Sequence, residues 1–391
     1  MRVGIFTECY RPVINGVVFS VLNFKEALEK RGHEVIVFAP ATDQENGEKD
    51  LVSCRMISHP TYPGYGFTLP LSEEQRAVAA TLDLLHVQHP FIMGRYALAL
   101  SRKYRKPLVF TNHTQYGQYS HYIPFLGTLL QGAIEDYAIR FINKCDLVVA
   151  PSASIEKYLK AKQITRPIEI VPNGINISRF ADRNHDRLEA KKRLSLDPDA
   201  RIILYSGRIA LEKNLDFLLD SFKALLNKTP APKVKLVIAG NGPQEDNFRR
   251  MVAERELSEN IIMLGARAHD EMPKIYGAAD IFATASKTEV HPLTIIEAQA
   301  SGLPVVALKA MGTSDIITHG EGGLLVEENV EGFSSALSRL LNNADLRERM
   351  AKGGQAGAVR FSIENSTTRL LSAYDLAMAE HAKRQVLTHK A

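Results

Sequence analysis

The chain has 391 residues, of which 45% are hydrophobic and 24% charged, values typical of a soluble globular protein with about two domains. It has no apolar run near the roughly 18 residues of a membrane span and no apolar start long enough for a secretory signal peptide. Its three cysteines are far apart and have neither metal-binding nor disulfide spacing. Together these features predict a cytoplasmic protein. Its net charge of +4 is too small for a nucleic-acid-binding protein; it fits a slightly basic surface and a peripheral contact with anionic lipid equally well.

Short β-branched runs alternate with helical patterns along the chain, which predicts an α/β fold of parallel sheets built from βαβ units. An amphipathic helix is predicted at 17–31, with Gly32 as its stop. The strands predicted in the first half are 2–6, 34–39, 83–87, 107–111, 146–150 and 168–171. After a polar stretch at 182–186 the alternation restarts, with strands predicted at 202–206, 234–239, 260–264, 280–284, 304–307 and 323–326.

Two consecutive doubly wound, Rossmann-like domains are the simplest account of this pattern. We expect them at residues 1–178 and 179–360, followed by a helical segment, 361–391, that packs back across the first domain. Ligands in such folds bind beyond the carboxyl ends of the strands. The cleft between the two domains is therefore the expected site.

Two strand ends in the first domain carry candidate residues. Asn15 and Gly16 lie between the first strand and the first helix, where a helix N-terminus offers free N–H groups to an anion; an ordinary βα turn explains them equally well. His113 follows strand 107–111. A lone histidine is more often structural, but its place at a strand end favours a functional one.

In the second domain, the loop after strand 202–206 carries Arg208 and Lys213 and opens a helix. Arginine can hold a phosphate with two N–H groups, and lysine adds a point charge. This pattern suits a phosphate site, and a solvated loop with scattered charges explains it about as well.

The loop after strand 280–284 is the most specific pattern in the chain. Pro292 suits the first turn of a helix, so the N–H groups of Leu293 and Thr294 would face the cleft, with Glu289 before the helix and Glu297 within it. Carboxylates accept hydrogen bonds from hydroxyls, as in a sugar and a ribose. A capping acid and a surface glutamate are the alternative interpretation.

Taken together, these residues give the chain a resemblance, over nearly its full length, to the family 4 glycosyltransferases, retaining enzymes of the GT-B architecture. The stretches that match are Asn15-Gly16, His113-Thr114, Val171–Ile175, Gly207-Arg208 with Lys213-Asn214, Ala239–Pro243, and the Glu289 to Glu297 spacing.

The resemblance implies a role for each matching residue. His113, Arg208, Lys213 and Glu289 would be catalytic: His113 near the reacting carbon, the two cations on the diphosphate, and Glu289 on the hydroxyls of the sugar. Residues implied to bind the donor are Asn15, Gly16, Gly242, Arg267, His291, Leu293, Thr294 and Glu297. Fixed cations at the leaving phosphate would make a metal unnecessary, so no cofactor is expected. His291 departs from the family pattern and leaves the identity of the donor sugar open.

Within the family, the first half is most similar to bacterial enzymes that glycosylate diacylglycerol, in stretches that include Phe6–Pro12, Gln88–Phe91 and Asn112–Tyr116. This implies transfer of a hexose from UDP-glucose or another UDP-sugar to a membrane lipid at the cytoplasmic face of the membrane, with Tyr10 and Tyr116 near the acceptor. A soluble acceptor remains the alternative. A non-catalytic nucleotide-sugar binder and an epimerase fit less well, because the charged set is intact and no acid/base pair is evident.

A segment for lipid access is the predicted helix 124–143, whose apolar residues include Phe125 and Leu129, near the basic residues Arg102 and Lys103. An amphipathic face with basic neighbours can dock on a membrane. A core helix with a solvated loop explains the same residues.

Overall fold

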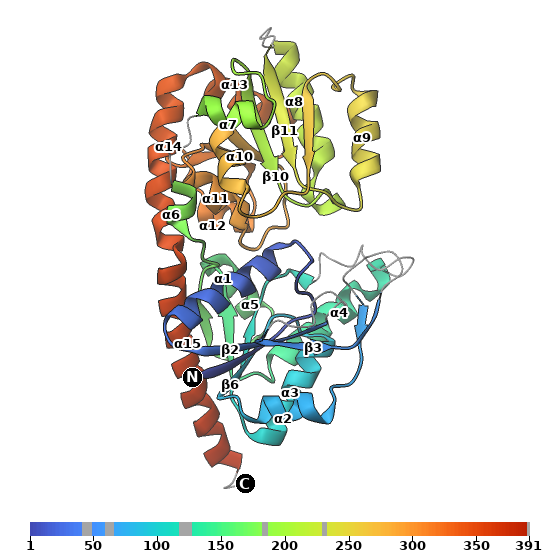
Figure 1. The fold of residues 1–391 in the computed structure, drawn as a ribbon, viewed down its shortest axis with the longest axis vertical. Helices are drawn as coiled ribbons and strands as arrows, with labels where there is room; N and C mark the ends of the chain where they lie inside the picture. The colour runs from blue at the N-terminus through green and yellow to red at the C-terminus, as the bar shows by residue number, and fades with distance from the viewer. Residues whose placement is uncertain (41–48, 59–65, 117–126, 182–186, 229–232, 389–391) are drawn as a thin grey trace. The chain divides into compact units, whose positions relative to one another are not determined.

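The computed structural model describes residues 1–40, 49–58, 66–116, 127–181, 187–228 and 233–388. The chain forms two compact units (Figure 1). Unit 1 comprises Met1–Gly174 and Ile363–Ala391, and unit 2 comprises Ile175–Ser362. The sequence predicted the first division after residue 178 and the second after residue 360.

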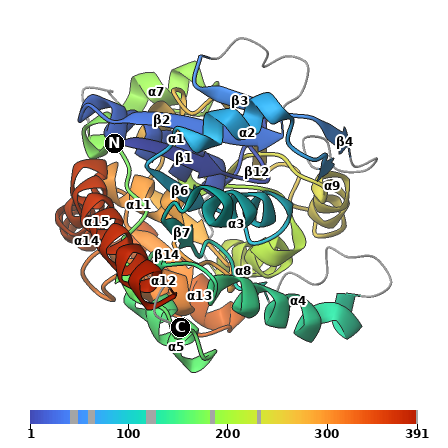
Figure 2. The same cartoon turned by 90° about the horizontal axis from the view of Figure 1, so that it is seen from below.

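Unit 1 contains a seven-stranded parallel sheet in the order β3-β2-β1-β6-β7-β8-β9. The strands are β1 (Arg2–Phe6), β2 (Glu34–Pro40), β3 (Leu51–Cys54), β6 (Leu84–Val87), β7 (Leu108–Thr111), β8 (Leu147–Ala150) and β9 (Ile168–Ile170). An antiparallel hairpin of β4 (Met56–Ser58) and β5 (Gly66–Thr68) extends beyond the end of β3 (Figure 2). The helices are α1 (Gly16–Lys30), α2 (Glu73–Ala80), α3 (Ile92–Tyr104), α4 (Gly127–Ile142), α5 (Ala153–Ala161) and α15 (Ile363–Thr388).

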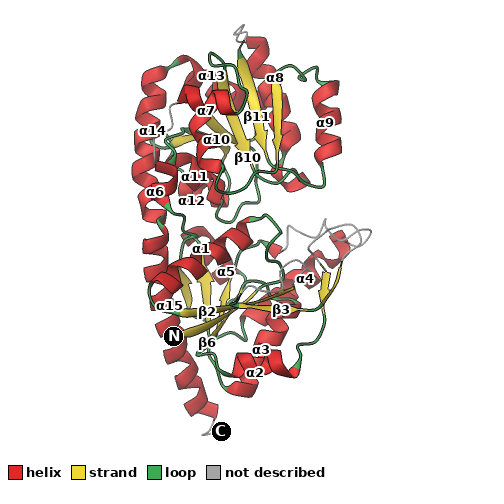
Figure 3. Cartoon of the chain, in the orientation of Figure 1, coloured by secondary structure: helices red, strands yellow, loops and turns green. Residues whose placement is uncertain are grey.

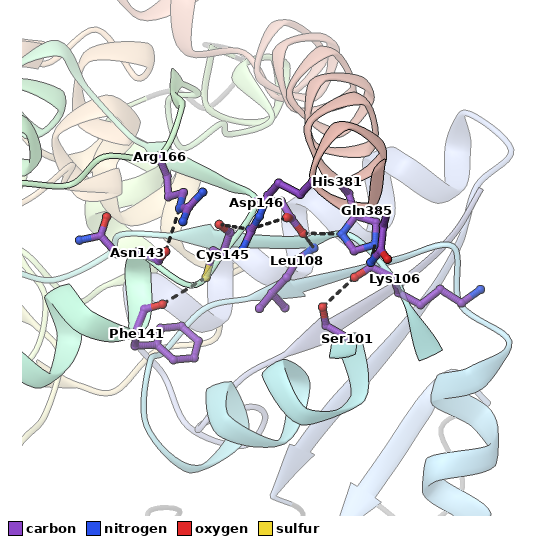
Figure 4. Close-up of polar contacts among 11 residues, drawn as sticks. Ser101, Lys106, Leu108, Phe141, Asn143, Cys145, Asp146, Arg166, His381 and Gln385 are labelled. Carbon is purple, nitrogen blue, oxygen red and sulfur yellow. Dashed lines mark hydrogen bonds and ion pairs between the residues drawn. The ribbon is translucent and has the colours of Figure 1, made fainter. Parts of the chain in front are cut away.

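Helix α15 lies far in sequence from the rest of unit 1, and Asp146 ties it to the sheet (Figure 4). The Asp146 carboxylate accepts a hydrogen bond from the Leu108 amide at 2.9 Å, from His381 Nδ1 at 2.9 Å and from Arg384 Nη1 at 2.7 Å. Nearer the start of the helix, the Tyr374 hydroxyl lies 2.8 Å from His86 Nδ1. These contacts hold α15 against β7 and β8.

Unit 2 contains a six-stranded parallel sheet in the order β12-β11-β10-β13-β14-β15. The strands are β10 (Arg201–Ser206), β11 (Val234–Ala239), β12 (Ile261–Gly265), β13 (Ile281–Thr284), β14 (Val305–Leu308) and β15 (Gly323–Val326). The helices are α6 (Ile177–Ala181), α7 (Arg187–Arg193), η4 (Leu211–Lys213), α8 (Leu215–Lys228), α9 (Glu245–Glu254), α10 (Met272–Ala278), α11 (Leu293–Ala300), α12 (Met311–Ile316), α13 (Val330–Asn342), α14 (Ala344–Ala358) and η5 (Val359–Phe361).

In each unit the sheet carries helices (Figure 3), and most residues of the central strands are buried, as expected for a parallel sheet covered on both faces. The predicted α/β fold is confirmed, and each predicted strand is present with its ends within one residue. The sequence did not predict β3, β4 or β5. These strands are short and lie at the edge of the sheet or outside it, where half-exposed residues give little periodicity.

Candidate active site

The strand order of each sheet reverses once, and several candidate residues follow the strands at that reversal: Arg208, Lys213 and Glu289 in unit 2, and Asn15 and Gly16 in unit 1. In unit 2, β10 pairs with β11 on one side and β13 on the other. In unit 1, β1 pairs with β2 and β6. In doubly wound folds, ligands bind beyond the carboxyl ends of the strands at such a reversal.

Lys213 and Glu289 meet in unit 2 although 76 residues separate them. Lys213 ends η4 after β10, and Glu289 lies in the loop after β13. Lys213 Nζ is 2.6 Å from Glu289 Oε1, and both side chains are less than one fifth exposed (19% and 18%). The pair therefore presents a cation and a carboxylate side by side.

Arg208 in the same loop is held by a residue that the sequence did not single out. Its Nη2 lies 2.6 Å from Oε1 of Glu212, whose side chain is only 1% exposed. The Glu212 carbonyl in turn accepts a hydrogen bond from Ser286 Oγ at 3.2 Å. Glu212 therefore orients the arginine, and the four-residue spacing was the only signal for it.

Glu297 is buried in α11 and uses both oxygens. Its Oε2 accepts a hydrogen bond from the Tyr276 hydroxyl at 2.8 Å, and its Oε1 lies 3.2 Å from His269 Nε2. Tyr276 also bonds Ser206 Oγ at 2.7 Å, and burial holds the pKa of its hydroxyl well above the usual range. Nothing in the sequence pointed to Tyr276 or His269, because only the fold brings them to Glu297.

The helix α11 begins one residue later than the sequence predicted, because Pro292 lies just before it and not in its first turn. Pro292 occupies the cap position in an extended conformation, and no side chain caps the helix. The amides of Leu293 and Thr294 stand in the first turn, where helical N–H groups lack intrahelical partners. This end of α11 can therefore donate to an anion.

Arg267 and His291, both predicted to contact the donor, differ in exposure. Arg267 follows β12, and its Nε is shielded from solvent without a hydrogen-bond partner among the described residues. His291 is buried, with its ring edge-on to Phe361 at 5.1 Å, and burial lowers its pKa to about 3. His291 is therefore a neutral side chain packed inside unit 2, and its predicted donor contact stays a prediction.

Gly16 and Gly242, both predicted to bind the donor, are structurally different. A Cβ on Gly242 would lie 2.3 Å from the Ile209 carbonyl oxygen, whereas a Cβ on Gly16 would meet nothing within 4 Å. We expect Gly242→Ala to lower the thermal midpoint, at a cost of about 1–3 kcal/mol for overpacking. Gly16→Ala should leave the midpoint unchanged and raise KM for the donor. An equal loss of stability in both variants would contradict this distinction.

In unit 1, Asn15 begins α1: its Oδ1 accepts a hydrogen bond from the Val18 amide at 2.8 Å, and its Nδ2 lies 3.3 Å from Cys9 Sγ. The side chain is thus used as a helix cap. Gly16 is the first residue of the helix. The predicted anion contact at Gly16 is sterically open.

His113 follows β7, and its Nε2 lies 2.7 Å from Gln88 Oε1. Burial, with smaller contributions from His89 and His86, holds the pKa of His113 well below its usual range. The ring is therefore neutral at pH 7. Because Nε2 donates to Gln88, Nδ1 is left as a hydrogen-bond acceptor.

Glu8, which the sequence did not single out, lies at the end of β1. Its Oε1 accepts a hydrogen bond from the Met93 amide at 2.7 Å, so it caps α3, which has no side-chain cap of its own. The Glu8 backbone amide donates to His89 Nδ1 at 3.2 Å. Burial raises the pKa of Glu8 from 4.5 to about 7.

The raised pKa of Glu8 predicts a pH-dependent stability. Between pH 4.5 and 7 the folded chain binds a proton that the unfolded chain has released, so this contribution is full below pH 4.5 and is lost as the pH rises through 7. Glu8→Gln should therefore raise the thermal midpoint at pH 8 and change it little at pH 5, with Glu169→Gln, an exposed carboxylate on β9, as the control. A midpoint that shifts equally at both pH values would exclude this effect.

The residues predicted to contact the acceptor or the membrane differ in how exposed the structure leaves them. Tyr10 is 1% exposed and packs in the core of unit 1, and its acceptor contact stays a prediction. Tyr116 is buried edge-on to Phe91. Arg102 and Lys103 are exposed on α3. Phe125 and the side chain of Leu129 lie outside the described residues.

The described part of α4 has a packing role. Ala138 and Phe141 are buried, and the Tyr137 hydroxyl donates to the Pro90 carbonyl at 3.2 Å. The end of this helix therefore belongs to the core, as the alternative interpretation held. Among the described residues, no helix has the length and apolar character needed to cross a membrane, and no three His, Cys, Asp or Glu side chains group as metal ligands would.

Comparisons with known proteins agree with this arrangement. Residues 14–179 match Glycosyltransferase Family 4, and residues 186–357 match Glycosyl transferases group 1. The chain is 29% identical to the alpha-monoglucosyldiacylglycerol synthase of Streptococcus pneumoniae, over 89% of this chain and 80% of the relative. It is also 29% identical to the synthase of that name from Acholeplasma laidlawii, over 93% and 94% of the two chains.

Among solved structures, the chain is similar to Anabaena Alr3699/HepE in complex with UDP and glucose, with a TM-score of 0.78, 17% identity, and coverage of 96% of this chain and 99% of that one. This likeness confirms the GT-B fold predicted from the sequence. Because the two family matches follow one another along almost the whole chain, the protein belongs to the glycosyltransferases, with a family 4 first half and a group 1 second half.

Proposed function

We propose that the enzyme transfers a hexose, with retention of configuration, from UDP-glucose or another UDP-sugar to a hydroxyl group of a membrane lipid such as diacylglycerol. The observation that carries the proposal is the similarity, along most of both chains, to two alpha-monoglucosyldiacylglycerol synthases. The enzyme would act as a peripheral protein at the cytoplasmic face of the membrane.

The residues of unit 2 suit a nucleoside-diphosphate sugar. Lys213 and Arg208 supply positive charge for the diphosphate, and the open end of α11 supplies N–H groups. Glu289 would bind hydroxyls of the sugar, and Glu297, fixed by Tyr276, those of the ribose. Arg267 Nε would donate to the nucleobase. In the transition state negative charge builds up on the leaving phosphate, where these fixed donors lower the barrier.

In unit 1, His113 would accept a hydrogen bond from a sugar hydroxyl through Nδ1 as the anomeric carbon gains oxocarbenium character. Gly16 would let the diphosphate approach the start of α1, since nothing occupies the space beside its Cα. The neutral state of the ring keeps this acceptor available across the physiological pH range.

Because Arg208 and Lys213 would neutralise the diphosphate, we expect activity without a divalent cation. Turnover in the presence of EDTA should equal turnover with added Mg²⁺ or Mn²⁺, measured as UDP release. A loss of activity in EDTA that Mg²⁺ restores would contradict this expectation.

The proposed function is tested by measuring UDP release from UDP-glucose with and without vesicles containing diacylglycerol, with the lipid product identified by mass spectrometry. Release that requires diacylglycerol and yields a glucosyl lipid would support the proposal. Release that ignores the lipid would favour the second candidate, a soluble acceptor. If UDP-glucose is inert and GDP- or ADP-sugars are used, the proposed donor is wrong. The anomeric configuration of the product, read by NMR, tests retention.

A further inference from the structure

The β4–β5 hairpin of unit 1 presents two large apolar side chains to solvent. Ile57 is 59% exposed and Phe67 is 67% exposed. The two are direct cross-strand partners, so their side chains lie on the same face of the hairpin. Adjacent exposed apolar side chains, unlike scattered single ones, indicate an interaction surface.

The opposite face of the hairpin is fixed to the body of unit 1. Met56 pairs with Thr68, which is buried, and the Tyr96 hydroxyl on α3 donates to the Thr68 carbonyl at 3.2 Å. A Cβ on Gly66 would lie 2.2 Å from the Ile57 carbonyl oxygen, so the two strands are closely packed there. These contacts fix the hairpin to unit 1 and leave the side chains of Ile57 and Phe67 exposed on its other face.

Exposed basic side chains lie on the elements next to this hairpin. Arg55, immediately before β4, is exposed. Helix α3, which packs on β5, exposes Arg95, Arg102 and Lys103 and contains no acidic residue. Such a charge distribution matches an anionic lipid surface, to which each basic residue adds attraction.

The hairpin also starts at the end of the sheet that carries Glu8 and His113. It continues from Cys54, the last residue of β3, at the carboxyl-terminal edge of the sheet, where Glu8 follows β1 and His113 follows β7. Burial is the main cause of the raised pKa values of Cys54 and Tyr96, and the charge of Glu8 also contributes to both. A lipid reaching this edge of the sheet would pass close to the hairpin.

We propose that Ile57 and Phe67, flanked by the basic residues of α3 and by Arg55, dock unit 1 on an anionic lipid bilayer. The inference rests on the lipid acceptor of the proposed function, and it names a surface other than the 124–143 helix suggested by the sequence. Ile57 and Phe67 enter the interface between headgroups and acyl chains, while the arginines remain among the headgroups.

The chain has no tryptophan, so Phe67→Trp in the full-length protein creates a single fluorescent reporter. With vesicles of phosphatidylcholine and phosphatidylglycerol, its emission should shift to the blue and be quenched by lipids brominated in the acyl chains. Leu387→Trp, on α15 at a position 68% exposed, is the matched control and should show neither effect. An unshifted spectrum from Phe67→Trp, or equal shifts in both variants, overturns the proposal.

A second pair of variants measures the affinity. Ile57→Glu/Phe67→Glu should lower the vesicle partition coefficient about tenfold or more, because it replaces buried apolar area by charge. Val386→Glu/Leu387→Glu, which makes the same change on exposed residues of α15, should bind like the parent chain. Circular dichroism and the thermal midpoint check folding. Equal losses in both variants overturn the proposal.

These readouts separate the docking surface from the reaction. Blue-shifted emission from Phe67→Trp without any lipid glycosylation would support the docking surface and refute the proposed function. Formation of glucosyl lipid by a chain whose residue 67 stays in water would refute the docking surface and support the function.

Discussion

Replacing Lys213 by alanine is expected to lower kcat by about 10²- to 10³-fold, with KM for the acceptor unchanged. The loss of one fixed donor to a developing oxyanion costs about 2.7–4 kcal/mol of barrier in comparable sites. In the free enzyme Lys213 is paired with Glu289 at 2.6 Å, so its charge is already desolvated and oriented before the donor binds. The measurement is steady-state UDP release at saturating acceptor.

The matched control for this variant is Lys228→Ala. Lys228 is also a lysine of unit 2, but its ion pair with Glu331 is exposed, and exposed pairs contribute little. The control should keep the parent kcat. A Lys213→Ala enzyme with normal turnover and a raised KM for the acceptor would show that Lys213 does not act on the leaving group. Glu289→Gln tests the contribution of Glu289 on its own, since it keeps Lys213 but weakens the proposed contact with the sugar.

Replacing His113 by alanine is expected to reduce kcat/KM for the donor by about 10- to 100-fold, the effect of losing one hydrogen bond and leaving its partner unsatisfied. His113→Asn, which restores an acceptor near the same place, should recover part of the activity. Because the pKa of His113 is held well below its usual range by burial, the ring stays neutral and no loss of activity between pH 8 and 6 should trace to it.

The pH profile supplies the test of that electrostatic argument. Glu8, whose pKa is raised to about 7, titrates in the same range, so the profiles of the parent and of His113→Asn must be compared. A transition between pH 6 and 7 that disappears in His113→Asn would mean that the histidine does titrate and that the argument is wrong. His33→Ala, at a half-buried position between α1 and β2, serves as the control for a histidine outside the site.

Much of the site could be predicted because its residues lie at strand ends. Arg208 and Lys213 share one loop, and the loop that carries Glu289 leads into the helix that carries Glu297. The sequence could not reveal Tyr276 or His269, whose roles depend on contacts made by folding, and its only signal for Glu212 was the four-residue spacing from Arg208. It also could not show that Tyr10 is buried, since a tyrosine in a strand-end loop suits a binding site and a core equally well.

The sequence by itself determined the α/β class, the positions of the main strands along the chain and the chemical character of the strand-end loops, because local hydrophobic periodicity and turn residues encode them. Only the tertiary structure decided which side chains meet. It paired Lys213 with Glu289, tied Glu297 to Tyr276, and brought α15 back to Asp146 across more than 200 residues. It also set the burial that keeps His113 neutral and raises the pKa of Glu8. Desolvation depends on all the atoms packed around a group in the folded chain, so the local sequence around that group does not determine it.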